Sequence, residues 1–252
     1  MILYFSGTGN SKYVAEKLAL ATNERIFAID DCIKFNNYNF LLSDNENLGI
    51  VCPTYFWQLP DIMVNFLKEI SVNATDNYIY FISTYGMVTG QSFNVVRELL
   101  KRKGLKLKAA YSVKMPDIWT PVFDLSNKKR VEKINKLSDI EIENIIDAVR
   151  EKKEGNFQKN RMPRLISKFV YSKYESARKT KHFSVSDKCI GCGMCANKCP
   201  VGAIEISDGK PVWKIEKCTM CLGCLHRCPK AAISYDNKTN EHGQYTNPNV
   251  KI

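Results

Sequence analysis

The chain has 252 residues, of which 44% are hydrophobic and 25% are charged, so it can bury one large core or two of ordinary size. It contains no run of about eighteen apolar residues, which argues against a membrane span, and its N-terminus lacks the features of a secretory signal. The net charge of +11 is uneven. Residues 1–100 carry 6 Lys and Arg against 10 Asp and Glu, residues 101–182 carry 22 against 10, and residues 183–252 carry 9 against 6. The positive charge is therefore concentrated in the middle of the chain, at net +12.

The first predicted strand, residues 2–5, leads into a loop with two glycines and then into a helix. The loop reads Ser6-Gly7-Thr8-Gly9-Asn10-Ser11. Such a loop can hold a phosphate group, because backbone N–H groups and the helix N-terminus face the anion. The P-loop of nucleotide hydrolases is excluded, since no Lys ends the loop in the required position.

Two phosphate-containing ligands remain open from these residues. The dinucleotide fingerprint nearly fits at Gly7 and Gly9, although Lys12 stands where the third glycine belongs, and Asp30 follows at the position of a ribose-binding acid. The other ligand is flavin mononucleotide (FMN), whose phosphate would be held by backbone amides and by hydroxyl groups of the loop.

Two later loops favour FMN. The predicted strand LGIVC leads into residues 53–60 and the predicted strand YIYFIS leads into residues 83–91, and both loops carry aromatic residues. In an open α/β sheet, ligands bind beyond the carboxyl ends of the strands. The aromatic loops could therefore enclose a flat ring while the first loop holds its phosphate.

The remaining elements of the first 152 residues fit the same architecture. Residues 92–104 read as a helix that ends at Gly104, LKLKAAYSVKM reads as a strand, and a long helix follows from about residue 126 to 153. Short strands that alternate with helices imply a parallel sheet. We expect a doubly wound, five-stranded parallel sheet in the order 2-1-3-4-5 over residues 1–152.

With S-x-T-G-N-S at residues 6–11 and aromatic loops after the third and fourth strands, this region resembles the flavodoxin family. The resemblance implies FMN, with Tyr55, Trp57 and Tyr85 against its ring; ordinary core packing is the alternative role of these aromatics. The residues that it implies for cofactor binding are Ser6, Thr8, Gly9, Asn10, Ser11, Pro53, Thr54, Tyr55, Phe56, Trp57, Ser83, Thr84, Tyr85, Gly86 and Gly90.

Residues 153–182 form a basic segment that joins this region to the next. A helix is predicted after Pro163, with an apolar stripe surrounded by Lys and Arg; the stripe consists of Leu165, Ile166, Phe169, Val170 and Tyr174. We expect the stripe to pack on the neighbouring domain, as in most amphipathic helices of globular proteins. Peripheral contact with a membrane stays open, and no nucleic-acid partner is expected.

Eight of the ten cysteines form an internal repeat of the pattern C-x2-C-x2-C-x3-C-P. The first half contains Cys189, Cys192, Cys195 and Cys199, and the second contains Cys218, Cys221, Cys224 and Cys228. This is the spacing of bacterial two-cluster ferredoxins, in which the fourth cysteine of each run binds the other cluster. Zinc is the alternative, but a zinc site needs only four ligands and gains nothing from this repeat.

Residues 183–236 thus resemble the ferredoxin domain that holds two 4Fe–4S clusters. One cluster is expected on Cys189, Cys192, Cys195 and Cys228, and the other on Cys218, Cys221, Cys224 and Cys199. Because the clusters claim eight cysteines, the chain points to a reducing cytoplasm, and Cys32 and Cys52 are expected to be small buried hydrophobic residues. Residues 237–252 are polar and are expected to form a loosely held tail.

Together the two resemblances suggest the flavodoxin–ferredoxin fusion proteins of anaerobic bacteria and archaea. They imply FMN and two 4Fe–4S clusters in a chain that passes electrons between low-potential carriers, with no catalytic side chain of its own. The alternatives are an FMN-dependent reductase of a small acceptor (a quinone, a nitro compound or a metal ion) and a cluster-based redox sensor. The basic middle region predicts acidic partners, either ferredoxin- or flavodoxin-type carriers or a redox partner enzyme, with Lys128, Lys129 and Arg130 at the docking face.

Overall fold

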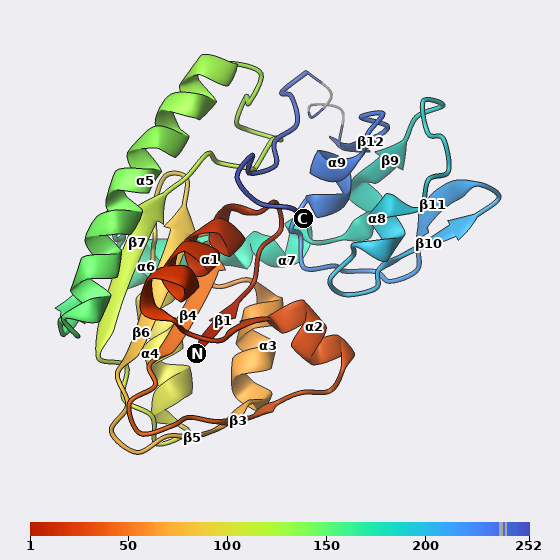
Figure 1. Cartoon of the computed structure of the whole chain (residues 1–252). Coiled ribbons are helices and arrows are strands. Elements are labelled where there is room, and N and C mark those ends of the chain that lie inside the picture. The colour runs from red at the N-terminus through yellow and green to blue at the C-terminus, as the bar shows by residue number, and fades with distance from the viewer. Residues whose placement is uncertain (237–238, 240) are drawn as a thin grey trace.

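The computed structural model describes residues 1–236, 239 and 241–252. A twisted parallel sheet with helices on both faces forms the first domain (Figure 1). Its strands, in spatial order, are β2 (Ile26–Ala28), β1 (Ile2–Tyr4), β4 (Leu48–Pro53), β6 (Ile79–Tyr85), β7 (Ala109–Lys114) and β8 (Gly155–Asn156). The predicted order 2-1-3-4-5 is confirmed by the first five. The strand β8 extends the sheet at one edge. It has only two residues, too few to show the apolar pattern from which a strand is predicted.

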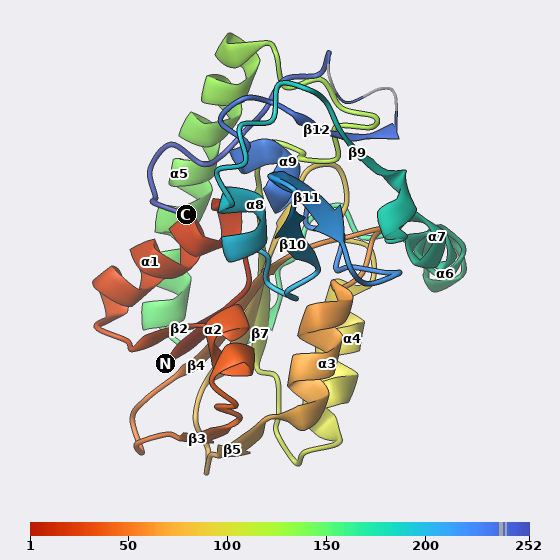
Figure 2. The ribbon, with the colours of Figure 1, turned by 90° about the vertical axis from the view of Figure 1, so that its right-hand side faces the viewer.

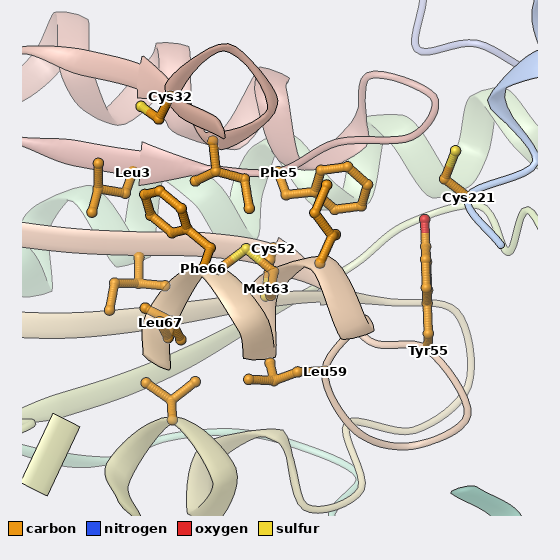
Figure 3. Close-up of a cluster of buried hydrophobic side chains, with 14 of the residues drawn as sticks. Leu3, Phe5, Cys32, Cys52, Tyr55, Leu59, Met63, Phe66, Leu67 and Cys221 are labelled. Atoms are coloured by element: carbon orange, nitrogen blue, oxygen red, sulfur yellow. The ribbon is translucent and has the colours of Figure 1, made fainter. Parts of the chain in front are cut away.

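The helices α1 (Asn10–Thr22) and α5 (Lys128–Arg150) cover one face of the sheet, and α3 (Asp61–Glu69) and α4 (Ser92–Lys101) cover the other (Figure 1). Successive strand residues face opposite cores, so Ile2 packs toward α1 and Leu3 toward α3. Figure 3 shows Cys32 and Cys52 within the second of these cores, which confirms that both are buried hydrophobic residues. The helix α2 (Ile29–Lys34) and the parallel pair β3 (Asn39–Leu41) and β5 (Ser71–Asn73) complete the domain.

The connecting segment contains the helices α6 (Arg164–Ser172) and α7 (Tyr174–Ala177) and the 3-10 turn η1 (Thr180–His182). The helix expected after Pro163 is therefore confirmed, but the packing of its whole apolar stripe is not. Tyr174 is fully buried and Val170 is half-buried, whereas the side chains of Leu165, Ile166 and Phe169 are exposed. The two helices α6 and α7 pack instead through positions 167, 170, 171 and 174, which follow the i, i+3, i+4, i+7 pattern of one helical face.

The second domain is a small α+β unit rich in cysteine. The strand β9 (Phe183–Val185) pairs antiparallel with β12 (Ile233–Tyr235), and β10 (Ile204–Ser207) pairs with β11 (Lys210–Trp213). Two short helices, α8 (Met194–Asn197) and α9 (Gly223–Arg227), pack against each other beside the strand pairs (Figure 1). No helix within the described residues is long and apolar enough to cross a membrane.

The C-terminal residues do not form the loose tail that their polar composition predicts. Residues 237, 238 and 240 of this tail lie outside the described residues, but residues 244–252 pass from α9 to the start of α1 (Figures 1 and 2). Tyr245 and Asn247 are buried there. The polar side chains that suggested a solvated tail are used for hydrogen bonds to other elements, as described below.

Candidate cofactor-binding sites

A cavity of about 320 Å³ lies beyond the carboxyl ends of the central strands and is walled by both domains; we call it the interdomain cavity. Most of the residues predicted to bind a cofactor line it: Ser6, Thr8, Asn10, Ser11, Pro53, Thr54, Tyr55, Phe56, Trp57, Thr84, Tyr85 and Gly86. The three loops therefore meet as the topology of an open sheet requires.

Three of the predicted residues do not line this cavity, because other residues of the protein pack against them. Ser83 is fully buried in the sheet, where its Oγ accepts a hydrogen bond from Gln158 Nε2 at 2.8 Å. Gly90 lies against Trp57, since a Cβ on Gly90 would be 2.0 Å from the Trp57 carbonyl oxygen. Gly9 lies under the C-terminal residues, with a Cβ there only 2.9 Å from Val250 Cγ2.

The rest of the wall was not among the predicted cofactor residues, although Gly7, Met87 and Val88 belong to the predicted loops at 6–11 and 83–91. It comprises Gly7, Met87, Val88, Met115, Pro116, Asp117, Ile118, Trp119, Val122, Phe123, Val170, Met220 and Leu222. The wall residues between 115 and 123 directly follow β7, whose carboxyl end lies at the same edge of the sheet, so the strand order itself contained this signal. Met220 and Leu222 come from the second domain, and no local pattern connects them to the first.

The first loop has the geometry of a phosphate-binding loop. Ser6 Oγ accepts a hydrogen bond from the Gly9 amide at 3.0 Å, and Ser11 Oγ lies 2.7 Å from Thr84 Oγ1, which links the first loop to the loop after β6. The backbone turns into α1 at Gly9, whose φ of 98° suits glycine. The amides of the first turn of α1 have no acceptor within the helix, so they are available to an anion.

The aromatic loop after β4 is a tight two-residue turn. Tyr55 and Gln58 exchange backbone hydrogen bonds of 2.9 and 3.0 Å, and Phe56 and Trp57 between them have φ values of 47° and 66°. Bulky residues rarely adopt left-handed conformations, and such strain often accompanies binding sites. The Trp57 carbonyl accepts from the Gln91 amide at 2.9 Å, which ties this turn to the loop after β6.

Two buried hydroxyl groups at the cavity wall fit a polar ligand. Thr54 Oγ1 and Tyr55 Oη have no hydrogen-bond partner in the described part of the chain. The Tyr55 hydroxyl points toward Cys221 (Figure 3), and burial raises its pKa far above the ordinary value, so it stays protonated and can donate. A ligand with phosphate and ring heteroatoms, as FMN has, would supply the missing acceptors.

A carboxyl group completes the cavity wall. Asp117 Oδ1 accepts a hydrogen bond from the Trp119 amide at 3.0 Å, and its other oxygen rests against Gly86, where an added Cβ would lie 2.0 Å away. Burial raises the pKa of Asp117 above its ordinary value, although the Trp119 N–H opposes the shift. The group therefore holds a proton more readily than an exposed aspartate.

The cysteines gather into two groups of four, as the repeat predicts. Cys189, Cys192, Cys195 and Cys228, which we call the outer cysteine set, line one small cavity. Cys199, Cys218, Cys221 and Cys224, the inner cysteine set, line another. Each fourth cysteine thus lies with the other half of the repeat, and the equivalent amides of Ala203 and Ala232 donate to the Cys199 and Cys228 sulfurs at 3.2 Å. Within the described residues, no group of His, Cys, Asp or Glu is arranged to hold a single metal ion.

The two sets differ in burial. Cys192 of the outer set is exposed and its neighbour Ile190 is 61% exposed, whereas Cys218 and Cys221 of the inner set are buried. Burial raises the pKa of the Cys218 thiol to about 11 and that of Cys221 to about 12. Buried thiols of this kind ionise when a cation binds them, so the inner set suits an iron–sulfur cluster.

The inner cysteine set touches the first loop, residues 6–11. A Cβ on Gly7 would lie 2.7 Å from the Cys221 carbonyl oxygen and 3.0 Å from both Cys221 Cβ and Tyr55 Oη, so only glycine fits between them. Arg227 Nη2 donates to the Gly7 carbonyl at 2.6 Å, and its Nη1 donates to the Lys198 carbonyl at 3.2 Å. One guanidinium group thereby joins the first loop to the backbone of both halves of the cysteine repeat.

Comparison with known families agrees with this geometry. A model of the flavodoxin domain matches residues 1–142. The chain belongs to the flavodoxin domain family. A model of the 4Fe–4S dicluster domain matches residues 188–233 of the same chain, so a ferredoxin domain follows the flavodoxin domain. Both resemblances are confirmed, and the combination makes the chain an electron-transfer redox protein.

Individual relatives cover smaller parts of the chain. Ferredoxin-2 from Desulfomicrobium norvegicum is 59% identical over 27 residues, which are 11% of this chain and 46% of that protein. The chain thus spans about half the length of this relative. The structure of the Trp repressor binding protein from Bacillus subtilis covers 57% of this chain and 99% of its own, at 10% identity and a TM-score of 0.31, which is too low to support an argument.

A second polar network fastens the ferredoxin domain to the flavodoxin domain. Tyr174 Oη, from the connecting segment, lies 2.9 Å from Asp61 Oδ1 and 2.7 Å from the Thr219 carbonyl, two acceptors for its single proton. Thr219 Oγ1 also donates to Asp61, and Arg178 forms an ion pair with Asp61 while its Nε donates to the Cys218 carbonyl. The inner set is therefore held in place by hydrogen bonds from the connecting segment and from the first turn of α3.

Proposed function

We propose that this chain is an electron-transfer iron–sulfur flavoprotein that passes electrons between low-potential carriers with two 4Fe–4S clusters and FMN. The observation that carries the proposal is the contact between Cys221 of the inner set and Gly7 of the phosphate-binding loop. Iron–sulfur clusters exchange electrons singly and a flavin can hold two, so their proximity would couple one-electron to two-electron chemistry.

The difference in burial between the two cysteine sets indicates which set a protein carrier can approach from solvent. The outer set reaches the surface at Cys192 and Ile190, where a protein carrier can approach. The inner set lies against the interdomain cavity, because Cys221 contacts Gly7 and Met220 lines the cavity, whereas no cysteine of the outer set lines it among the described residues. We therefore assign the outer set to exchange with partners and the inner set to exchange with the flavin site.

The residues proposed to hold FMN divide into two groups. Ser6, Thr8 and Ser11 would bind the phosphate with the amides of α1, and Tyr55, Trp57 and Tyr85 would contact the ring. The dinucleotide alternative has less support. Its ribose-binding acid, Asp30, is absent from the lining of the interdomain cavity among the residues that the structure describes.

A reductase of a small acceptor is the second candidate, favoured by one observation. Asp117 lines the interdomain cavity and burial raises its pKa, so it could deliver a proton to an acceptor bound there. Pure electron transfer does not require such a group. A turnover screen of quinones, nitro compounds and metal ions with Asp117→Asn as a comparison would favour this candidate if one acceptor shows saturable reduction that the variant loses.

Purified anaerobic protein provides the direct test of the cofactors. We expect about eight iron, about eight sulfide and one FMN per chain, without zinc. A redox titration followed by absorbance and electron paramagnetic resonance should then resolve two cluster signals and the flavin. Zinc in place of iron, about four iron in total, or preferential binding of NAD over FMN would contradict the proposal.

A further inference from the structure

The helix α6 has two apolar faces, and only one of them packs on the protein. Ser167, Val170 and Tyr171 face the flavodoxin domain. On the outer face, Leu165, Ile166 and Phe169 are 83%, 46% and 66% exposed. Three large apolar side chains on one exposed face of a nine-residue helix form an apolar patch. Such a patch is unfavourable in water, so this face is suited to binding a partner.

The charge around this face specifies an anionic partner. From Arg161 to Lys173 the chain has no acidic residue, but it has four basic ones, all exposed: Arg161, Arg164, Lys168 and Lys173. Lys173 Nζ lies 5.3 Å from the centre of the Phe169 ring, so positive charge stands directly beside the apolar face. A partner must therefore have an apolar region that accepts these side chains, with negative charge directly beside that region.

The helix α6 adjoins the interdomain cavity through its packed face. Val170 of α6 lines this cavity, as do Met87 and Val122, which are 58% and 62% exposed. The loop that carries Met87 is attached to the residues just before α6, because the Thr89 amide donates to the Asn160 carbonyl at 3.1 Å. Figure 2 shows α6 and α7 at the edge of the molecule, away from the sheet.

We propose that the outer face of α6 docks on a bilayer that contains anionic lipids. Leu165, Ile166 and Phe169 enter the boundary between headgroups and acyl chains, and the surrounding Lys and Arg side chains contact lipid phosphates. A bilayer fits better than an acidic protein, because Leu165 and Phe169 project from a helix and a fluid surface needs no matching shape. The inference does not depend on the proposed electron transfer.

Vesicle sedimentation of the anaerobic holoprotein tests the lipid requirement. We expect binding to vesicles of phosphatidylcholine and phosphatidylglycerol in equal parts, at least about tenfold stronger than to phosphatidylcholine alone. Added salt should weaken the binding, because exposed charges are screened. A protein that stays in the supernatant with anionic vesicles at low salt would overturn the proposal.

A matched pair of variants tests the face itself. In the first, Leu165→Asp and Phe169→Asp should lower partition into anionic vesicles by about a hundredfold. The control is Leu20→Asp with Phe35→Asp, since Leu20 and Phe35 are 85% and 72% exposed on another part of the surface. The control should bind as the parent does. Equal partition of the two variants would contradict the proposal, and circular dichroism with flavin absorbance shows whether both are folded.

Two other occupants have distinct outcomes in the same experiment. If the face joins two copies of the chain, sedimentation velocity should show a dimer that only the Leu165/Phe169 variant dissociates, without vesicle binding. If the face binds an acidic carrier, that carrier should be retained by the parent and lost by the same variant, again without vesicle binding. Either result would replace the bilayer as the partner.

Discussion

At the scale of single residues, the Tyr55 hydroxyl tests the cofactor assignment of the interdomain cavity. It is buried, lacks a partner in the described chain and lies near both Gly7 and Cys221. We expect Tyr55→Phe to raise the Kd for FMN about tenfold, because a donor is lost, and to leave the flavin-free protein equally stable or more stable by about 1 kcal/mol. Flavin fluorescence titration and thermal unfolding measure the two quantities.

Tyr80 provides the matched control for this prediction. Its hydroxyl is also buried without a partner in the part of the chain that the structure describes, but it belongs to the core between the sheet and α1. Tyr80→Phe should leave the Kd for FMN unchanged. If both variants change flavin affinity alike, the effect comes from the domain core and Tyr55 is no ligand.

The crossed arrangement of the cysteines makes a prediction for a second residue pair. Cys199→Ala should damage the cluster of the inner set, and Cys228→Ala should damage that of the outer set, although each cysteine is nearer in sequence to the other set. The two variants are matched, since both sulfurs accept a hydrogen bond of 3.2 Å from an amide four residues later. Paramagnetic resonance of the reduced proteins distinguishes the remaining clusters. Loss of the sequence-adjacent cluster in either variant would contradict the crossed scheme.

At the scale of elements, the C-terminal residues connect the ferredoxin helix α9 to the flavodoxin loop. Gln244 Nε2 donates to the Cys228 carbonyl at 2.8 Å, and Tyr245 Oη donates to Asn10 Oδ1 at 2.8 Å. The backbone amide of Asn247 donates to the Thr8 carbonyl at 2.8 Å. Removal of residues 244–252 should therefore weaken FMN binding about tenfold, because the loop loses its support. The iron content should change less than the flavin content.

A milder pair of variants separates this effect from general damage. Asn247 is buried and its side chain donates to Asn10 Oδ1, whereas Asn249 is exposed. Asn247→Ala should speed flavin release, as measured by fluorescence after dilution, and Asn249→Ala should change it little. Similar release rates in the two variants would show that the tail does not support the loop.

The elements that the sequence predicts well are those with strong local patterns. The cysteine spacing predicts the outer and inner sets through its resemblance to two-cluster ferredoxins, in which the fourth cysteine of each run joins the other set. The strand order follows from apolar runs that alternate with helices, and it brings the loops at 6–11, 53–60 and 83–91 to one edge. Twelve of the fifteen predicted cofactor residues accordingly line the interdomain cavity.

The predictions from sequence are wrong where the contacts join residues far apart in the chain, or where one pattern of residues fits two different packings. The helix α6 is apolar on both sides, so Leu165 and Phe169 matched a buried stripe as well as Val170 and Tyr174 did. The tail binds Asn10 through single hydrogen bonds across more than two hundred residues, and such contacts leave no periodicity in the sequence. The composition of the tail therefore shows that it is polar, but it does not indicate that the tail packs against the flavodoxin domain.

At the scale of the whole molecule, the basic middle region predicts salt-dependent association with acidic carriers. Lys128, Lys129 and Arg130 are exposed at the start of α5, and Lys128 Nζ donates to the Gln244 carbonyl in the C-terminal tail. Reduction by an acidic protein carrier should slow about tenfold or more with added salt, whereas reduction by a small neutral reductant should not.

Reversing all three charges to Glu should flatten the salt dependence of carrier reduction. The control is the same reversal of Lys101, Arg102 and Lys103 at the end of α4, another run of three basic residues. Stopped-flow absorbance measures the rates. A parent rate that does not respond to salt, or equal effects of the two reversals, would remove the start of α5 from the docking face.

The docking of the tail also has a consequence for biosynthesis. Domains generally fold during translation in the order of their synthesis, so the flavodoxin sheet can form while the ribosome is still adding the ferredoxin cysteines. Thr8 and Asn10, among the first residues to emerge, nevertheless receive their hydrogen bonds from Asn247 and Tyr245, which are among the last described. Full flavin affinity would then come only after the cysteine-rich domain has been made, and an incompletely translated chain would hold flavin about tenfold more weakly than the finished one.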